Sequence, residues 1–175
     1  MNVRPALFAD LDRCQRLDGG YSTAYVWQLD ETVEPEQIAV VFRRTRVPRT
    51  VQVPYPRPLD DLFEDWRRRE CLLVAEDAGS VAGFLDMVVD PERWQGWVQH
   101  LLIHRPFRRQ GVANLLLDAA ERWARGSELT SINITVQPKN DPGISLLLKR
   151  GYGFRGFTDR YFGNNDAGLI YTMSL

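Results

Sequence analysis

The segment spanning residues 97–125 limits the choice of fold more than any other part of this chain, because it joins three local structures in a fixed order. Its apolar run 97–103, rich in large and β-branched residues, predicts a buried strand. A basic turn that contains Arg108 and Gly111 follows. Apolar residues at three- and four-residue spacing then predict an amphipathic helix, which Gly126 ends. The segment therefore predicts a strand, a turn and a helix packed as one unit.

The turn between this strand and this helix has the features of a phosphate-binding site. The first N–H groups of a helix have no partner within the helix, and its dipole places partial positive charge there. Gly111 lets an anion approach the backbone closely, and Ala113 adds little bulk. Side chains such as Arg108 and Arg109 can neutralise further phosphate charge. We therefore favour a phosphate site over an ordinary strand–helix connection.

Two motifs in the chain resemble those of the GNAT N-acetyltransferases. Arg108-x-x-Gly111-x-Ala113, placed after an apolar strand, resembles the family's acyl-CoA signature. A second match begins at Asn140, where an asparagine precedes an apolar helix and the pair Gly151-Tyr152. The resemblance implies acetyl-CoA as the cosubstrate, and it implies that coenzyme A is bound by Leu101, Leu102, Ile103, Arg108, Arg109, Gln110, Gly111, Val112, Ala113 and Asn140.

The sequence leaves two roles open for Asn140. In the family the asparagine amide bonds the pantetheine arm of the coenzyme, and Asn140 inherits that role by resemblance. An asparagine placed before Pro142 also suits the N-cap of a helix. Both roles are compatible with the sequence.

The order of the predicted elements extends the resemblance over nearly the whole chain. A strand and a helix begin the chain, an amphipathic helix is predicted over 59–69, and a strand hairpin over 71–89. After the central unit come a strand over 131–136, a helix and two further strands. We predict one domain, residues 1–175, of the α/β (α+β) class, with a GNAT-like mixed, mostly antiparallel sheet flanked by helices.

The segment 21–57 matches the family least well, and we expect it to be a variable insert on the acceptor side. The apolar run 38–42 and the alternating run 47–53 predict an exposed hairpin whose prolines protect its edges. Such a hairpin could form a homodimer contact or a lid over a pocket. Aromatic residues beside acids suit an amine with an apolar body, although core aromatics are about equally expected. The acceptor-binding candidates are Tyr25, Trp27 and Asp30.

Composition excludes several other classes of function. The net charge of −1 gives no sign of a nucleic-acid partner. No apolar run approaches the ~18 residues of a membrane helix. Cys14 and Cys71 lack a Cys-x-x-Cys partner, so we expect buried reduced thiols, a cytoplasmic protein and no metal site. A Gly-x-Gly-x-x-Gly stretch at 151–156 follows a helix instead of a strand, which argues against a dinucleotide site.

This chain departs from the resembled family at the residues that would transfer protons. Many members of the family place a tyrosine acid seven residues after the motif's asparagine, where this chain has Leu147. Three catalytic candidates remain: Gln99, Asp86 and Tyr161. Gln99 shares strand parity with Leu101 and could hold a relaying water, whereas His100 is expected on the opposite face. For Asp86, a surface carboxylate is the favoured alternative.

We therefore predict an N-acetyltransferase that moves acetyl from acetyl-CoA to a primary amine of a small molecule or peptide. Because acetyl-CoA is already activated, positioning alone can supply much of the rate, even without a named acid. The alternative is a non-catalytic acyl-CoA sensor, which Leu147 and the missing base suggest.

Overall fold

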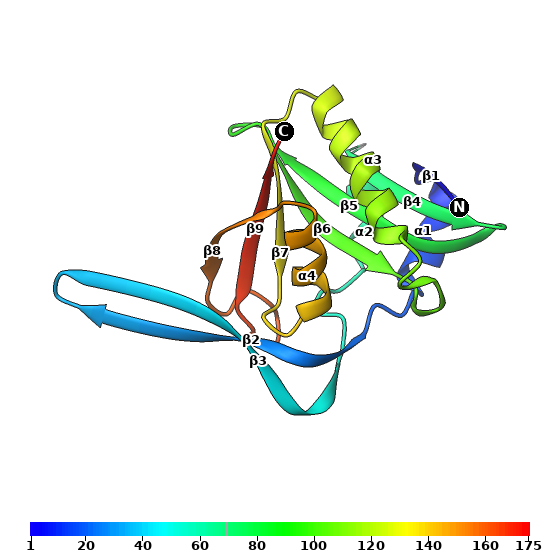
Figure 1. The fold of residues 1–175 in the computed structure, drawn as a ribbon. Coiled ribbons are helices and arrows are strands. Elements are labelled where there is room, and N and C mark those ends of the chain that lie inside the picture. The colour runs from blue at the N-terminus through cyan, green and yellow to red at the C-terminus, as the bar shows by residue number, and fades with distance from the viewer. Residues whose placement is uncertain (69) are drawn as a thin grey trace.

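The strand predicted over 97–103 lies at the centre of the fold as β6 (Gln95–Ile103). The structure is a computed structural model, and it describes residues 1–68 and 70–175 (Figure 1). Seven strands form one sheet in the order β1-β4-β5-β6-β7-β9-β8. The β6–β7 pair is parallel and the other pairs are antiparallel. The predicted α/β class with a mixed, mostly antiparallel sheet is therefore confirmed.

The other strands of this sheet lie within a few residues of the ranges that the sequence predicts. They are β1 (Asn2–Pro5), β4 (Cys71–Asp77), β5 (Ser80–Asp90), β7 (Ser131–Val136), β8 (Gly153–Thr158) and β9 (Gly168–Ser174). The β4–β5 hairpin turns through Ala78 and Gly79, both with positive φ, which is the geometry that a tight two-residue turn requires.

Helices cover both faces of the sheet (Figure 1). They are α1 (Phe8–Gln15), α2 (Leu62–Arg67), α3 (Val112–Gly126) and α4 (Asp141–Lys149), with a short 3-10 helix η1 (Arg105–Phe107). On one face α1 and α2 bury Leu11 and Leu62 against Phe84. On the other, α3 and α4 bury Leu116 and Ile144. The helix predicted over 59–69 is shorter than expected, and the end of that prediction, Arg69, lies outside the described residues.

The parallel pair at the centre of the sheet separates part-way along its length. β6 and β7 pair from Gln95 opposite Ser131 to Val98 opposite Ile134. β6 then continues to Ile103 and β7 to Val136 without further pairing between these two strands in the described chain. The two strands therefore separate beyond Val98 and Ile134, and the first residues of α3 line the cavity that lies there.

A β-bulge in β6 lies at the point of separation. Asp86 of β5 is opposite His100, and Met87 is opposite Val98, so Gln99 has no partner on β5. A bulge places one extra residue in a strand and disturbs its alternation. Burial nevertheless alternates along β6 through this point: Gln99 and Leu101 are half-buried and both line the cavity, as the predicted parity requires, and His100 between them is buried.

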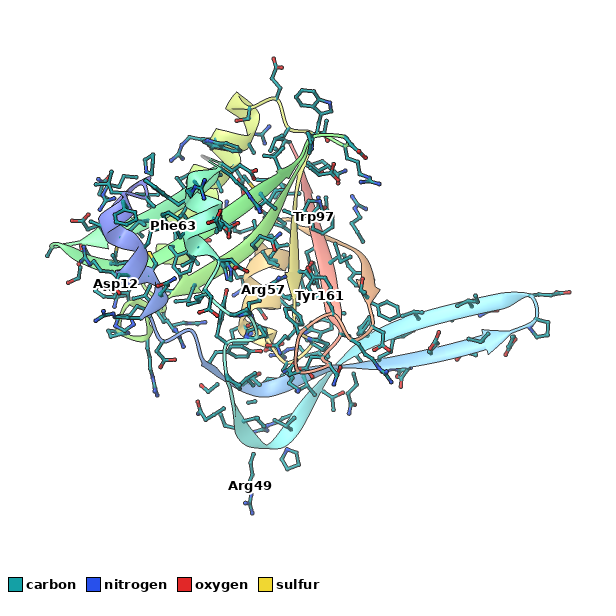
Figure 2. The ribbon with its side chains drawn as sticks, turned by 180° about the vertical axis from the view of Figure 1, so that it is seen from behind. Asp12, Arg49, Arg57, Phe63, Trp97 and Tyr161 are labelled. Carbon is teal, nitrogen blue, oxygen red and sulfur yellow. The ribbon has the colours of Figure 1, made fainter. Side chains whose placement is uncertain are left out.

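The insert forms a separate two-stranded sheet that projects from the body of the molecule, as Figures 1 and 2 show. It consists of β2 (Tyr21–Glu34) and β3 (Gln37–Val53). The prediction that runs 38–42 and 47–53 pair with each other is wrong, because both belong to β3 and pair with β2. Pro48 does not end the strand: it lies where the register shifts, and a bulge tolerates its missing N–H.

Candidate functional site

A cavity of about 700 Å³ opens where β6 and β7 separate. Both sequence motifs contribute to its wall. Of the predicted coenzyme residues, the wall contains Leu101, Leu102, Ile103, Arg108, Arg109, Gly111, Val112, Ala113 and Asn140. Gln110 lies outside the lining, and its side-chain amide donates a hydrogen bond to the carbonyl of Pro106 at 2.9 Å. The fold therefore brings the two motifs, about 30 residues apart in the sequence, to one cavity.

The N-terminus of α3 points unpaired amides at this cavity. Gly111 is the N-cap and has a φ of 85°, a left-handed conformation that favours glycine. No side chain caps the helix. Among the hydrogen bonds of the described chain, none gives a protein acceptor to the backbone N–H groups of residues 109–114. These donors and the positive end of the helix dipole form an anion-binding site.

The side chain of Arg108 holds the turn in place. Its guanidinium donates to three backbone carbonyls: Ile103 at 2.9 Å, Gly20 at 2.6 Å and Asp18 at 2.8 Å. Burial lowers the pKa of Arg108 from its usual range. The guanidinium therefore ties the turn to the start of β2, and Arg109, which is exposed, is the motif arginine that remains open to solvent.

Asn140 caps α4, as one of its two expected roles requires. Its side-chain oxygen accepts a hydrogen bond from the N–H of Gly143 at 2.9 Å. Among the described residues, Nδ2 of Asn140 donates no hydrogen bond to the protein, so this amide group is available to a ligand in the cavity. A role in binding the coenzyme stays a prediction. Leu147 is 2% exposed and packs in the core.

The three catalytic candidates lie in different environments. Gln99, at the bulge, lines the cavity. Tyr161 lies outside the cavity lining. Its hydroxyl accepts a hydrogen bond from the guanidinium of Arg57 at 3.1 Å, and Figure 2 shows these two side chains near one another. Asp86 is 1% exposed, so the expectation of a surface carboxylate is wrong. It is buried because it lies opposite His100 on the face that α1 and α2 cover.

Asp86 belongs to a cluster of buried ionisable groups. Its pKa is raised to about 8, because burial disfavours the charge and because Asp65 and Glu70 lie nearby. Asp65 and Asp86 influence one another's pKa, and the charge of Arg68 acts to lower the pKa of both. Among the described residues, Oδ2 of Asp86 has no hydrogen-bond partner. Burial, followed by the charge of Arg57, lowers the pKa of His100 to about 4. His100, on the same face as Asp86, is therefore neutral near pH 7.

Two further tyrosines line the cavity, and sequence reasoning did not single out Tyr55 as a functional residue. The hydroxyl of Tyr55 lies 3.0 Å from Nδ1 of His100, and burial raises the pKa of Tyr55. The hydroxyl of Tyr21 donates to Oε1 of Gln137 at 2.9 Å. The sequence did offer a signal for Tyr55, because it is the single aromatic residue of the proline-rich segment 54–58. Prolines keep such a segment extended, so the side chain of Tyr55 is free to contact a residue distant in the sequence.

The acceptor-binding candidates surround an ion pair at the start of α4. The guanidinium of Arg44 bonds both carboxylate oxygens of Asp141, at 2.7 and 2.9 Å, and lies 3.6 Å from the ring centre of Tyr25. Trp27 donates to the same carboxylate at 3.1 Å, and Arg44 lowers the pKa of Asp141. None of the three candidates, Tyr25, Trp27 and Asp30, belongs to the cavity lining, and Asp30 forms an exposed ion pair with Arg43 of β3.

Two further structural findings concern the described part of the chain. None of its helices has the length and apolar content needed to span a bilayer. No group of three or more histidine, cysteine, aspartate or glutamate side chains is arranged there to hold a metal ion. Cys14 and Cys71 are buried free thiols, as the sequence predicts.

Comparison with known proteins identifies relatives of this chain. The family model for the acetyltransferase (GNAT) family matches residues 35–154. Streptothricin acetyltransferase from Escherichia coli is 28% identical over 88 residues, which cover 46% of this chain and 51% of that protein. Acetyltransferase SG1711 from Sodalis glossinidius is 33% identical over 101 residues, 55% of this chain and 70% of that protein. The match thus spans about half the length of the streptothricin enzyme.

Two solved structures share the fold over nearly the full chain. Nourseothricin acetyltransferase superposes with a TM-score of 0.83 at 19% identity, covering 99% of this chain and 97% of that one. A protein assigned as a streptothricin acetyltransferase from Bacillus anthracis, in complex with acetyl coenzyme A, gives a TM-score of 0.80 at 15% identity, with 99% of each chain covered. At these identities the likeness shows the fold alone.

We expect Arg108→Lys to destabilise the protein by about 1–3 kcal/mol, because a lysine cannot replace a fork of three hydrogen bonds. For a chain of this size the melting temperature should fall by about 3–8 °C, measured by calorimetry. The matched control is Arg109→Lys, at the next position, where the side chain is exposed. It should change the melting temperature by less than about 2 °C. Equal effects of the two substitutions on the melting temperature would contradict the conclusion that Arg108 holds the turn in place.

We also expect Asp86 to make stability fall as pH rises. Its folded pKa lies above the unfolded value, so between about pH 4 and pH 8 the folded state holds a proton that the unfolded state has lost. The free energy of unfolding therefore decreases across this window. Asp86→Asn should flatten the decrease by at least about 1.4 kcal/mol, the equivalent of one pKa unit, in urea titrations at several pH values. The exposed Asp60→Asn is the control, and parallel pH profiles for wild type and Asp86→Asn would refute this assignment.

Proposed function

The chain belongs to the acetyltransferase (GNAT) family, and from this premise we propose that it transfers acetyl from acetyl-CoA to a primary amine of a small molecule or peptide. One observation carries the proposal: unpaired amides at the start of α3 face a cavity that opens between β6 and β7. We further propose that residues 1–175 act as a single domain, with 21–57 as its acceptor-side insert.

In this proposal the amides of residues 109–114 and the side chain of Arg109 hold the diphosphate of the coenzyme. Nδ2 of Asn140 donates to a carbonyl of the pantetheine arm. The free edges of β6 and β7 beyond their last pair offer further backbone groups to that arm. A backbone N–H within 101–103 donates to the thioester oxygen, where negative charge develops during attack. Acetyl-CoA supplies the activated acetyl group.

A proton path runs from the cavity through Tyr55. An acceptor bound as an ammonium ion must lose a proton before its nitrogen attacks. Tyr55 takes this proton while it passes its own to Nδ1 of His100, 3.0 Å away, and the proton returns through Tyr55 to the coenzyme A thiolate that leaves when the C–S bond breaks. Asp86, opposite His100 in the sheet, stabilises the imidazolium when its own carboxyl is ionised. Gln99 holds a water beside the same site, and Tyr161 is the alternative proton donor.

Small-molecule amines are the favoured acceptor class, because relatives of this chain are streptothricin and nourseothricin acetyltransferases. Tyr25 and Trp27 shape the acceptor side through Arg44 and Asp141, and Asp30 belongs to the outer insert. A non-catalytic acyl-CoA sensor is the second candidate, since Leu147 replaces the usual tyrosine acid and is buried.

The decisive experiment incubates the purified chain with acetyl-CoA and a panel of amines, including streptothricin, an amino-terminal peptide and a simple arylalkylamine. Release of free thiol should depend on one or more of these amines. Saturable coenzyme binding without amine-dependent thiol release would instead support the sensor. In the same assay we expect Tyr55→Phe to lower kcat on the order of a hundredfold with little change in KM. Tyr161→Phe is the matched control and should change kcat by less than about threefold. The reverse result would move the proton path to Tyr161.

We expect Gly111→Glu to weaken coenzyme A binding by at least about tenfold, or ~1.4 kcal/mol, in calorimetric titrations. The new carboxylate would repel the diphosphate at the helix N-terminus, and the φ of 85° strains any side chain placed there. Gly126→Glu introduces the same charge at the other end of α3, in open space, and should leave the affinity unchanged. Unaltered binding by Gly111→Glu would show that the diphosphate lies elsewhere.

A further inference from the structure

The wall of the cavity contains a guanidinium that is not paired with an acid. Arg57 lines the cavity and is half-buried. Within residues 1–68 and 70–175 it has no ion-pair partner, and it makes one hydrogen bond, from Nη2 to the hydroxyl of Tyr161 at 3.1 Å. A guanidinium carries five N–H donors in a planar fork. Most of the donors of Arg57 are therefore free to bind a ligand.

The surrounding structure holds Arg57 in place before a ligand binds. Pro56 and Pro58 flank it, and a proline restricts both its own backbone and that of the residue before it. The central carbon of the guanidinium lies 5.2 Å from the ring centres of both Tyr161 and Phe162. Figure 2 shows Arg57 beside Tyr161. Because the side chain is already ordered, binding an anion there costs less conformational entropy than at a free surface arginine.

Arg57 also lies beside the proposed proton path. It follows Tyr55 by two residues, and the hydroxyl of Tyr55 lies 3.0 Å from Nδ1 of His100. Burial lowers the pKa of His100 and raises that of Tyr55, and the charge of Arg57 adds to the first effect and opposes the second. Asp86, which also acts on Tyr55, lies outside the cavity lining. An amine that gives its proton to Tyr55 therefore brings its nearest substituents towards Arg57.

The acids around the cavity are already paired with bases. Among the described residues that line it, Asp141 is the single carboxylate, and Arg44 bonds both of its oxygens, at 2.7 and 2.9 Å. Asp166, which accepts a hydrogen bond from the lining residue Gln137, is paired with Lys139 at 2.7 Å. A second cationic group on the acceptor would therefore find no free carboxylate in the described lining, whereas an anionic group would find a free guanidinium.

We propose that Arg57 binds a carboxylate of the acceptor, which makes the substrate an amino acid or another amine with a carboxylate a few bonds from its nitrogen. The fork of a guanidinium matches the two oxygens of a carboxylate. The proposal rests on the proposed acetyl transfer, whose acceptor it names. The nitrogen forms the new amide bond, the C–S bond breaks, and the thiolate takes up the proton that the amine loses. The carboxylate stays unchanged and orients the amine.

Matched pairs of acceptors test the proposal with the full chain. The two members of each pair differ only in the carboxylate: L-phenylalanine with phenethylamine, L-lysine with cadaverine, and γ-aminobutyrate with propylamine. Release of free thiol at saturating acetyl-CoA gives kcat/KM for each amine. In at least one pair we expect the member with the carboxylate to have the higher kcat/KM, by at least about tenfold, with most of the difference in KM.

Arg57→Gln should reduce the preference in that pair to less than about threefold. It should do so by lowering kcat/KM for the member with the carboxylate, while the other member changes by less than about twofold. Arg49→Gln is the matched control, because Arg49 is an exposed arginine of β3 that Figure 2 shows well apart from Arg57. It should leave the preference unchanged.

Two results would overturn the proposal while acetyl transfer stands: a wild type that prefers the carboxylate in none of the three pairs, and an Arg57→Gln variant that loses activity equally towards both members. The second result would show that Arg57 only supports the fold. If no amine releases thiol, the transferase function fails, and calorimetric titration of the same pairs into the protein saturated with coenzyme A decides on the site. Tighter binding of the members with a carboxylate, lost in Arg57→Gln, supports it, and equal or absent binding overturns it.

Discussion

The incomplete pairing of β6 with β7 is the constraint on which the other features of the site depend. A sheet normally satisfies the N–H and C=O groups of its central strands on both sides. Here the pairing ends at Val98, and the bulge at Gln99 lies at the same point. β6 continues to Ile103, and the polypeptide then enters α3 by way of η1 and Gly111. An internal strand edge and an uncapped helix N-terminus thus face one cavity, and both present backbone donors to a ligand.

The sequence predicted this unit well because its signals are local. The strand, the glycine turn and the amphipathic helix lie in one continuous segment, and each follows from the period or conformation of neighbouring residues. The position of Arg108 was equally evident, but the partners of its guanidinium were not. The carbonyls of Gly20 and Asp18 lie about 90 residues away in the chain, and no local pattern indicates that they meet this turn.

The errors arose where strand register decides the environment of a residue. Asp86 was expected at the surface, since no sequence signal reveals the bulge that pairs it with His100 on a covered face. The runs 38–42 and 47–53 were interpreted as two paired strands, yet they form one strand with an irregularity near Pro48. The contact between Tyr55 and His100 joins an extended linker to the central strand across 45 residues. A contact of that kind depends on the complete fold.

The buried ionisable cluster behind Tyr55 costs stability, and this cost bears on its role. A carboxyl such as Asp86, buried next to Asp65, would be replaced by an apolar side chain if packing alone governed the site. The same chain has a buried leucine at position 147, the position at which the resemblance led us to expect the tyrosine acid that many family members use. In the proposed mechanism the two observations are connected. Proton transfer then uses Tyr55 and His100, which are in contact next to the bulge of β6, in place of a residue of α4.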